Sequence, residues 1–443
     1  MRIVLTLILG FWVVSVHAAG NQALLELLRA LHENGTIDRQ TYDLVIQAAE
    51  QETPAGAEQL QATDETSEQS VREMIRHEIA QVTTKESKKG PTVRVGGRIQ
   101  LDAATFAEDQ ARHNDGTEIR RARLFASGEL SEYWKYKLQY DFTGTGIDGL
   151  QDAYLEYTGL DLFNIRLGHF KEPFSLQNMT SSKYITFMER GMPHVFAEGR
   201  NIGLQLHRGG DNWNLYGGVF GDGRDGAGSD NDEGAGFAGR VTWLPWRYDG
   251  NLVHLGASVS HRASGSTDTL RFRERPESHV TDTRLVDTGT FDAESFTRVV
   301  AETAWVHEMF NLQAEYYHTS VDREISTNPD LDFNGFYVEG GWFITGESMN
   351  YKKSGNFSRV KPKTIVGQGG YGAWQLAARY SNLDLDDGDI NGGEIDSFTL
   401  GLNWFATEYL RFTANYVNVL EVDGGPLSGD EPDVFQLRAQ LEF

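Results

Sequence analysis

The sequence contains no cysteine, which excludes disulfide bonds and thiolate metal sites. It also contains no run of about twenty apolar residues after its N-terminal stretch, so we expect no helix that spans an inner membrane. Basic residues are scarce, 40 against 64 acidic ones, and the net charge is -24. This balance argues against a nucleic-acid partner, which requires a basic surface. No motif in the sequence indicates a metal site or a cofactor.

What the chain does have is alternation of apolar and polar residues. At its end, Phe435, Leu437, Ala439, Leu441 and Phe443 are apolar and the residues between them are polar. A transmembrane β-strand has about this length, with apolar side chains facing lipid and polar ones facing a lumen. A soluble β-sandwich also alternates. The strand length, the terminal aromatic residue and an export signal together favour an outer-membrane barrel.

From Pro91 onward the alternation predicts an all-β fold, a 16-stranded antiparallel transmembrane β-barrel, because bacterial single-chain barrels have an even number of strands. Short and long connections alternate, which places the short turns in the periplasm and the long loops outside. The turn 347–370 is the exception, since it is long and falls on the periplasmic side. The predicted strands are 92–106, 118–130, 133–143, 150–158, 163–170, 200–208, 212–221, 235–245, 251–262, 295–307, 310–321, 333–346, 371–385, 395–405, 409–420 and 433–443.

The N-terminal part is predicted to be separate from the barrel of residues 91–443. Residues 1–19 carry Arg2, a short apolar run and two small residues, the pattern of a secretory signal peptide. Residues 20–90 show helical spacing of apolar residues and a polar linker, and we expect a short helical, coiled-coil-like periplasmic segment. This segment is either a solvated helix or a region for oligomerisation or partner docking.

Basic residues form three groups that could face the lumen. An anion that crosses a narrow pore must replace its water with other donors, and guanidinium groups offer donors that match phosphate or carboxylate. The alternative for the first group is structural pairing with luminal carboxylates such as Asp102, Asp141 and Asp152. For the second group it is a solvated loop with Glu274 and Glu277 as partners, and for the third a solvated turn. The first group is Arg98, Arg120, Arg121 and Arg123; the second is Arg271, Arg273 and Arg275 in loop 263–294; the third is Lys352, Lys353, Arg359, Lys361 and Lys363 in turn 347–370.

Loop 171–199 is the expected constriction loop, and it holds Lys171, Lys183 and Arg190. In an extended segment of period two, the side chains of Arg271, Arg273 and Arg275 would lie on the same face. They would form a row of binding sites along which an anion could move. The third group would make a basic exit that attracts anions over roughly one Debye length, about 8 Å. Acidic clusters in other outer loops form a solvated rim, or one that bridges lipopolysaccharide through divalent ions.

At these residues the chain resembles the phosphate-selective porin O/P family. The resemblance covers nearly all of 91–443, and its stretches are specific only when taken together. It implies a homotrimeric sixteen-stranded anion channel of a Gram-negative outer membrane. The matching stretches are 96–100 (GGRIQ), 119–122 (IRRA), 134–136 (WKY), 157–159 (YTG), 180–183 (TSSK), 251–256 (NLVHLG), 372–374 (GAW), 402–405 (LNWF) and 414–417 (ANYV).

The resemblance also implies roles for single residues. Arg98, Arg120 and Arg121 match the central anion-site arginines, and Asp152 matches the acidic residue beside that site. Arg271, Arg273 and Arg275 match an arginine ladder. The chain departs from the phosphate-selective members at Asn178, where they carry a lysine, and Lys171 is the candidate to replace that charge.

Three hypotheses follow. The first is a porin for small inorganic anions, phosphate or polyphosphate by preference, with outer-membrane lipid and lipopolysaccharide around it. The second is a general or differently selective porin on the same scaffold, motivated by Asn178 and the acidic rims. The third, a barrel enzyme, lacks support, because the sequence shows no nucleophile elbow and no catalytic constellation.

Overall fold

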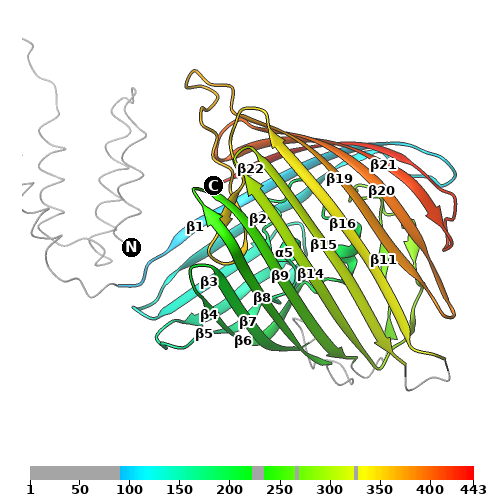
Figure 1. Cartoon of the computed structure of the whole chain (residues 1–443), viewed down its shortest axis with the longest axis horizontal. Helices are drawn as coiled ribbons and strands as arrows, with labels where there is room; N and C mark the ends of the chain where they lie inside the picture. Colours follow the sequence, from blue (N-terminus) through cyan, green and yellow to red (C-terminus); the bar gives the residue numbers. More distant parts are fainter. Residues whose placement is uncertain (1–89, 222–233, 265–268, 324–327) are drawn as a thin grey trace, which may run out of the picture. The chain divides into compact units, whose positions relative to one another are not determined.

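The computed structural model describes residues 90–221, 234–264, 269–323 and 328–443. These residues form a closed barrel of sixteen antiparallel strands, each paired with its neighbours in chain order (Figure 1). The expected signal peptide and the expected helical segment 20–90 lie outside the described residues, apart from Gly90. Within the described residues no helix has the length and apolar character needed to cross a membrane.

All sixteen predicted strands are present, which confirms the barrel prediction. Ten residue pairs, from Arg98–Glu442 to Ala107–Asp433, join the first strand to the last and close the sheet. The barrel strands are β1 (Arg94–Ala107), β2 (Gly116–Glu129), β3 (Trp134–Asp141), β4 (Leu150–Tyr157), β5 (Asn164–Lys171), β6 (Arg200–Gly209), β7 (Trp213–Gly221), β8 (Ala235–Tyr248), β9 (Asn251–Ala263), β14 (Ser295–His307), β15 (Phe310–Asp322), β16 (Leu331–Phe343), β19 (Ala373–Asp387), β20 (Ile390–Phe405), β21 (Leu410–Asp423) and β22 (Asp433–Glu442).

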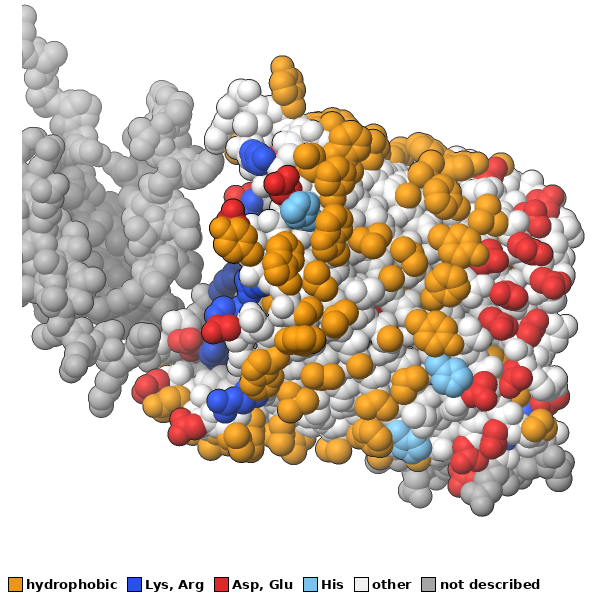
Figure 2. Space-filling view, in the orientation of Figure 1, with side chains coloured by type: hydrophobic (Ala, Val, Ile, Leu, Met, Phe, Trp, Pro, Cys, Tyr) orange, Lys and Arg blue, Asp and Glu red, His pale blue; other side chains and the backbone are white. Residues whose placement is uncertain are grey.

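The two faces of the wall differ as period two requires. In β22, Phe435 and Leu437 are about half exposed on the outer face, whereas Gln436 and Arg438 are buried on the inner face. Apolar side chains cover the outer wall, and carboxylates gather at one end of it (Figure 2). An apolar belt beside polar ends is the outer surface that a bilayer accepts.

Tight turns join several strands at one end of the barrel. Asp249 and Gly250 connect β8 to β9, and both have positive φ, 46° and 82°. A two-residue hairpin with positive φ at both central positions matches the twist of the flanking strands, which is why Asp-Gly suits this turn. The long connections lie at the opposite end, as the sequence predicts.

Several connecting segments fold into the barrel and fill one side of it. In the constriction loop, 171–199, lie the short helices α5 (Leu176–Met179) and η2 (Met192–Phe196). Phe174, Met192 and Phe196 pack in one apolar cluster with Phe272 of loop 263–294 and Tyr337 of the wall. Each large apolar side chain buried in this way contributes roughly 1.5–3 kcal/mol. The filling leaves the charged lumen beside the opposite wall.

Turn 347–370, the exception to the turn rule, also bends inward. Its hairpin of β17 (Asn350–Lys352) and β18 (Asn356–Ser358) lies under the constriction loop, where the amide N–H of Phe357 donates to the hydroxyl of Thr180 at 3.3 Å. Tyr351 contacts His254 of the wall through a 2.6 Å hydrogen bond. A long turn at the end of the tight turns is therefore tolerated here because it packs inside the barrel.

One fully buried ion pair fixes this turn to the wall. The Arg240 guanidinium donates to the Glu302 carboxylate at 2.8 and 2.6 Å and to the carbonyl of Gly355 at 2.8 Å. Glu302 also accepts from the hydroxyl of Ser258 at 2.7 Å. Both charged side chains are completely buried, so each depends on the other for compensation of its charge.

We expect Glu302→Ala to lower the free energy of unfolding by about 3–5 kcal/mol, because it leaves the Arg240 charge buried and unpaired. Denaturant unfolding of the refolded barrel measures this change. The double variant Arg240→Met with Glu302→Leu removes both charges and is expected to recover most of the loss. Equal instability of the single and double variants contradicts the explanation.

Candidate functional site: a charged lumen crossed by a loop

A β-bulge brings two consecutive arginines to the inner face of β2. Opposite β2, Gln100 pairs with Arg121 and Leu101 pairs with Ile119, so Arg120 is an extra residue in the ladder. In a regular strand Arg120 and Arg121 would point to opposite faces. A bulge interrupts the strict alternation of side chains between the two faces and changes their direction. As a result, the guanidinium groups of both Arg120 and Arg121 reach the lumen.

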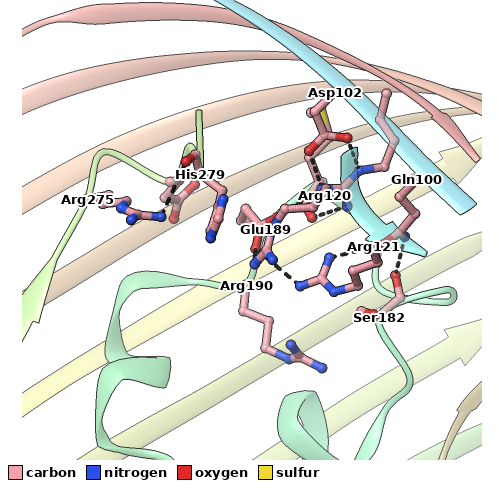
Figure 3. A network of polar contacts seen from close by, with 12 residues as sticks. Gln100, Asp102, Arg120, Arg121, Ser182, Glu189, Arg190, Arg275 and His279 are labelled. Carbon is pink, nitrogen blue, oxygen red and sulfur yellow. Dashed lines mark hydrogen bonds and ion pairs between the residues drawn. The ribbon is translucent and has the colours of Figure 1, made fainter. Parts of the chain in front are cut away.

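The constriction loop carries the carboxylate that these arginines bind. Glu189 accepts two hydrogen bonds from Arg120, at 2.9 and 3.1 Å, and one from Arg438 at 2.9 Å (Figure 3). Arg121 lies 3.7 Å from the same carboxylate, and its guanidinium also donates to Gln100 at 3.0 Å. This cluster crosses the lumen from β1, β2 and β22 to the loop.

Two polar cavities lie on either side of this crossing. The inner cavity, about 480 Å³, extends to Arg94 and Lys352 near the periplasmic end. The outer cavity, about 330 Å³, extends to Arg275 and His279 of loop 263–294. Arg121, Arg190 and His194 line both cavities, so the two spaces meet at these three side chains, which we call the neck.

The inner cavity is strongly basic. Eleven lysine and arginine side chains line it together with one carboxylate, that of Asp152. Asp152 pairs with Lys137 and with Arg200, at 2.5 and 2.8 Å. Four of these cations, Arg121, Arg123, Arg166 and Lys183, lie beside carboxylates outside the lining, those of Glu189, Asp141, Glu156 and Glu442. Eleven cations against these four carboxylates and Asp152 still leave a net positive charge around this space. The cations are Arg94, Arg98, Arg121, Arg123, Lys137, Arg166, Lys171, Lys183, Arg190, Arg200 and Lys352.

Five of these cations have no carboxylate within ion-pair distance among the described residues: Arg94, Arg98, Lys171, Arg190 and Lys352. Arg98 donates to the hydroxyl of Ser181 at 3.1 Å, and its Nε is buried without a partner. Arg190 donates to the backbone carbonyls of Gln177 and Thr180, at 2.9 and 3.0 Å. Lys171 donates to the carbonyl of Asn178. Their positive charge is therefore available to an anion in the cavity.

The neck combines charged and neutral donors. Burial lowers the pKa of Arg190 to about 10, which still leaves it charged at neutral pH. Burial, together with the charges of Arg190 and Lys171, holds the pKa of His194 well below its ordinary value, so its imidazole is neutral there. At neutral pH the neck thus presents two guanidinium groups and one uncharged ring.

Other predicted site residues occupy different surroundings. Arg123 pairs with Asp141 at 2.5 Å, and Lys183 pairs with Glu442 at 2.7 Å; both still line the inner cavity. Of the predicted ladder, Arg275 lines the outer cavity, whereas Arg271 and Arg273 are exposed and line neither cavity. Arg271 pairs with Asp287.

The predicted periplasmic cluster is also divided. Lys352 lines the inner cavity, and Arg359 pairs with Glu442 at 2.7 Å. Lys353 lies 3.3 Å from Asp211 at the surface. Lys361 and Lys363 are exposed and line neither of the two cavities.

Sequence reasoning named no role for several residues that the structure brings to the lumen. Glu189 and His194 belong to the constriction loop, and nothing in their spacing shows where a loop residue points. Lys137, Arg200 and Arg438 occupy strand positions, and alternation places two of them, Lys137 and Arg438, on the inward face. For these two residues, a basic side chain at an inward strand position was the sequence signal that could have predicted their place in the lumen.

The constriction loop is held in place by a carboxylate of the wall. Glu315 accepts from the backbone N–H groups of Leu176 and Gln177, at 2.6 and 2.9 Å, and from the hydroxyl of Tyr337 at 2.5 Å. The adjacent Ser175 has a φ of 62°, a conformation that costs energy for a residue with a side chain. Glu315 therefore fixes the start of α5 against the wall.

We expect Glu315→Ala to loosen the loop, because each buried donor left without an acceptor costs about 1–3 kcal/mol. Single-channel recordings are expected to show higher open-channel noise and a broader conductance distribution. Glu315→Gln keeps one carbonyl acceptor and should give an intermediate result. Conductance and noise identical to those of the unmodified protein would show that the loop is held by other contacts alone.

A closed transmembrane barrel, an in-folded loop and a charged lumen define a porin of the outer membrane. The comparisons with known proteins identify the family. A family model described as phosphate-selective porin O and P matches residues 93–443. The chain belongs to this family of channels, as the sequence resemblance implies, and it is not an enzyme.

Two relatives are similar to this chain over most of its length. The chain is 32% identical over 368 residues to an uncharacterized protein of Caulobacter vibrioides, covering 78% of this chain and 73% of that one. It is 27% identical over 394 residues to porin O of Pseudomonas aeruginosa, covering 79% and 88%.

Among solved structures, the chain resembles the outer-membrane channel DcaP of Acinetobacter baumannii. The TM-score is 0.52 at 13% identity, with 81% of this chain and 99% of that chain covered. A loop-deletion mutant of OmpT from Vibrio cholerae gives 0.51 at 12% identity, covering 80% and 100%. These similarities support the barrel fold.

Proposed function

We propose that the protein is an anion-selective channel that prefers phosphate or polyphosphate. The observation that carries the proposal is the excess of cations around the inner cavity, where Arg98, Lys171 and Arg190 have no carboxylate partner among the described residues. An anion entering this space exchanges water for charge-assisted hydrogen bonds. A cation would meet uncompensated repulsion in the same space.

Phosphate fits the donors better than a halide does. Guanidinium groups present paired N–H donors in a plane, which match the oxygens of phosphate. Arg98 and Arg190 supply such groups, and the hydroxyls of Ser181 and Ser182 line the same cavity. In this proposal Arg123 and Asp152 orient the neighbouring cations and balance part of their charge, and Lys183 lies at the same cavity.

Lys171 can replace the lysine that the phosphate-selective family members carry where this chain has Asn178. The Lys171 ammonium donates to the carbonyl of Asn178, and both residues line the inner cavity. The Asn178 amide instead donates to the carbonyl of Glu198 at 3.0 Å. We infer that Lys171 supplies beside residue 178 the positive charge that this position itself lacks. The general-porin alternative requires that this replacement fails.

We also propose that the protein assembles as a homotrimer, in keeping with its family. Arg271 and Arg273 act before the outer cavity, by attracting anions from the medium over about a Debye length. The surface lysines of turn 347–370 have the same role at the periplasmic side. Both groups change the rate of entry more than the affinity.

We expect Arg98→Ala to raise the phosphate concentration that half-blocks the chloride current by about tenfold or more, because a charge-assisted hydrogen bond contributes about 1.5–3 kcal/mol. Single-channel recording in a salt gradient gives both the block and the reversal potential. Arg112→Ala, which removes an exposed charge of an outer loop, is the matched control. Cation preference in the unmodified protein, or no block by phosphate, contradicts the proposed function.

Asn178→Lys tests the role of the departure. A second ammonium beside Lys171 is expected to lower the half-blocking phosphate concentration by about tenfold, the effect of one added charge-assisted contact. Asn178→Gln lengthens the side chain without charge and should leave the block near its original value. If the lysine variant has no effect, position 178 does not set the affinity for phosphate.

A further inference from the structure

The carboxylate of Glu189 lies where a bound anion would lie. It is held in a bidentate manner by Arg120, is bonded to Arg438 at 2.9 Å and is 3.7 Å from Arg121. Carboxylate and phosphate oxygens accept from guanidinium groups with the same paired geometry. The loop thus offers its own anion to arginines that line the outer cavity.

The backbone around Glu189 is fixed, while its side chain faces the cavity. The carbonyl of Glu189 accepts from Arg379 at 3.1 Å, and the amide of Met188 donates to Asn415 at 2.8 Å. Arg438 donates to the carbonyl of Met188. The side chain is 17% exposed. Its carboxylate can therefore leave the arginines by side-chain rotation, without movement of the loop.

The other carboxylates near these arginines determine which guanidinium groups would be left unpaired if the Glu189 carboxylate moved away. Arg438 keeps Asp102, which it holds with two hydrogen bonds of 2.7 and 2.6 Å. For Arg120 and Arg121, Glu189 is the only carboxylate within 4 Å among the described residues. Departure of Glu189 thus opens a site with two unneutralised guanidinium groups, one of which, Arg121, belongs to the neck.

Glu189 is charged when it occupies this site. Burial alone would raise the pKa of its carboxyl group, but the charges of Arg120, Arg121 and Arg438 outweigh burial and hold the pKa well below the ordinary value. At neutral pH the site therefore contains an anion attached to the loop.

We propose that Glu189 is a tethered competitor for an oxyanion site formed by Arg120 and Arg121, and that a permeating oxyanion enters this site by exchanging with the Glu189 carboxylate. The inference rests on the proposed function and deepens it. Exchange keeps the local charge nearly constant. Conduction requires binding that is strong enough for entry and weak enough for release, and an attached competitor weakens binding without removing the arginines.

Glu189→Gln tests the inference in the full-length protein with inorganic phosphate as the probe. The variant removes the competing charge, so the half-blocking phosphate concentration is expected to fall at least about tenfold and phosphate dwell times to lengthen. Glu189→Asp keeps the charge but shortens its reach, and a smaller fall is expected. Glu431→Gln, which removes an exposed carboxylate of an outer loop, controls for net charge and should show no fall.

The outcomes separate this inference from the proposed function. If the unmodified channel is anion-selective and blocked by phosphate, but Glu189→Gln binds phosphate equally or more weakly, only the competitor role is overturned. If the unmodified channel shows no phosphate block, the proposed function fails first. Heat-dependent electrophoretic mobility reports folding. Should Glu189→Gln not assemble, Glu189→Asp decides: tighter block supports the inference, and unchanged or weaker block overturns it.

Discussion

Compensation of charge inside the barrel determines the positions of the constriction loop, the inward-folded turn and the basic inner cavity. A closed sheet in lipid satisfies its own backbone hydrogen bonds, but each charge on its inner face still requires an opposite charge, a dipole or a solvated ion. Arg240 and Glu302 meet this requirement together and are completely buried. Arg98, Lys171 and Arg190 meet it only through hydroxyl and carbonyl dipoles. The first arrangement, a paired charge, stabilises the fold. The second, an unpaired charge, leaves positive charge that can bind a permeating anion.

The same requirement explains how the loop is positioned. Glu315 holds the start of α5 against the wall through two backbone N–H groups, and Arg379 and Arg438 hold the far part of the loop by donating to its backbone carbonyls. The loop is thus held at both ends by charged side chains of the wall, a carboxylate at one end and guanidinium groups at the other. Apolar packing around Phe196 then fills the remaining space on one side.

Alternation along the strands predicted the barrel together with the strand length, the terminal aromatic residue and the export signal, because period two records which side chains meet lipid. Arg98 and Arg123, two of the basic residues that stand out in an acidic sequence, line the inner cavity. Alternation could not place Arg120 beside Arg121, because strict alternation separates neighbours and the bulge depends on the pairing with β1. Loops have no such period. The inward fold of turn 347–370 and the position of Glu189 follow from partners distant in sequence, which local patterns do not contain.

The acidic net charge and the basic lumen are compatible because electrostatic selection is local. The chain carries -24 overall, yet carboxylates gather at one end of the outer wall (Figure 2), and of the carboxylates in the described part of the chain only that of Asp152 lines the inner cavity. Charges separated by more than a Debye length are largely screened in solvent, whereas those around a confined ion are not. Glu189 is the informative exception, since it brings negative charge to the neck itself. A carboxylate at that position lowers the field of the arginines at the point where a tightly held anion would otherwise stop.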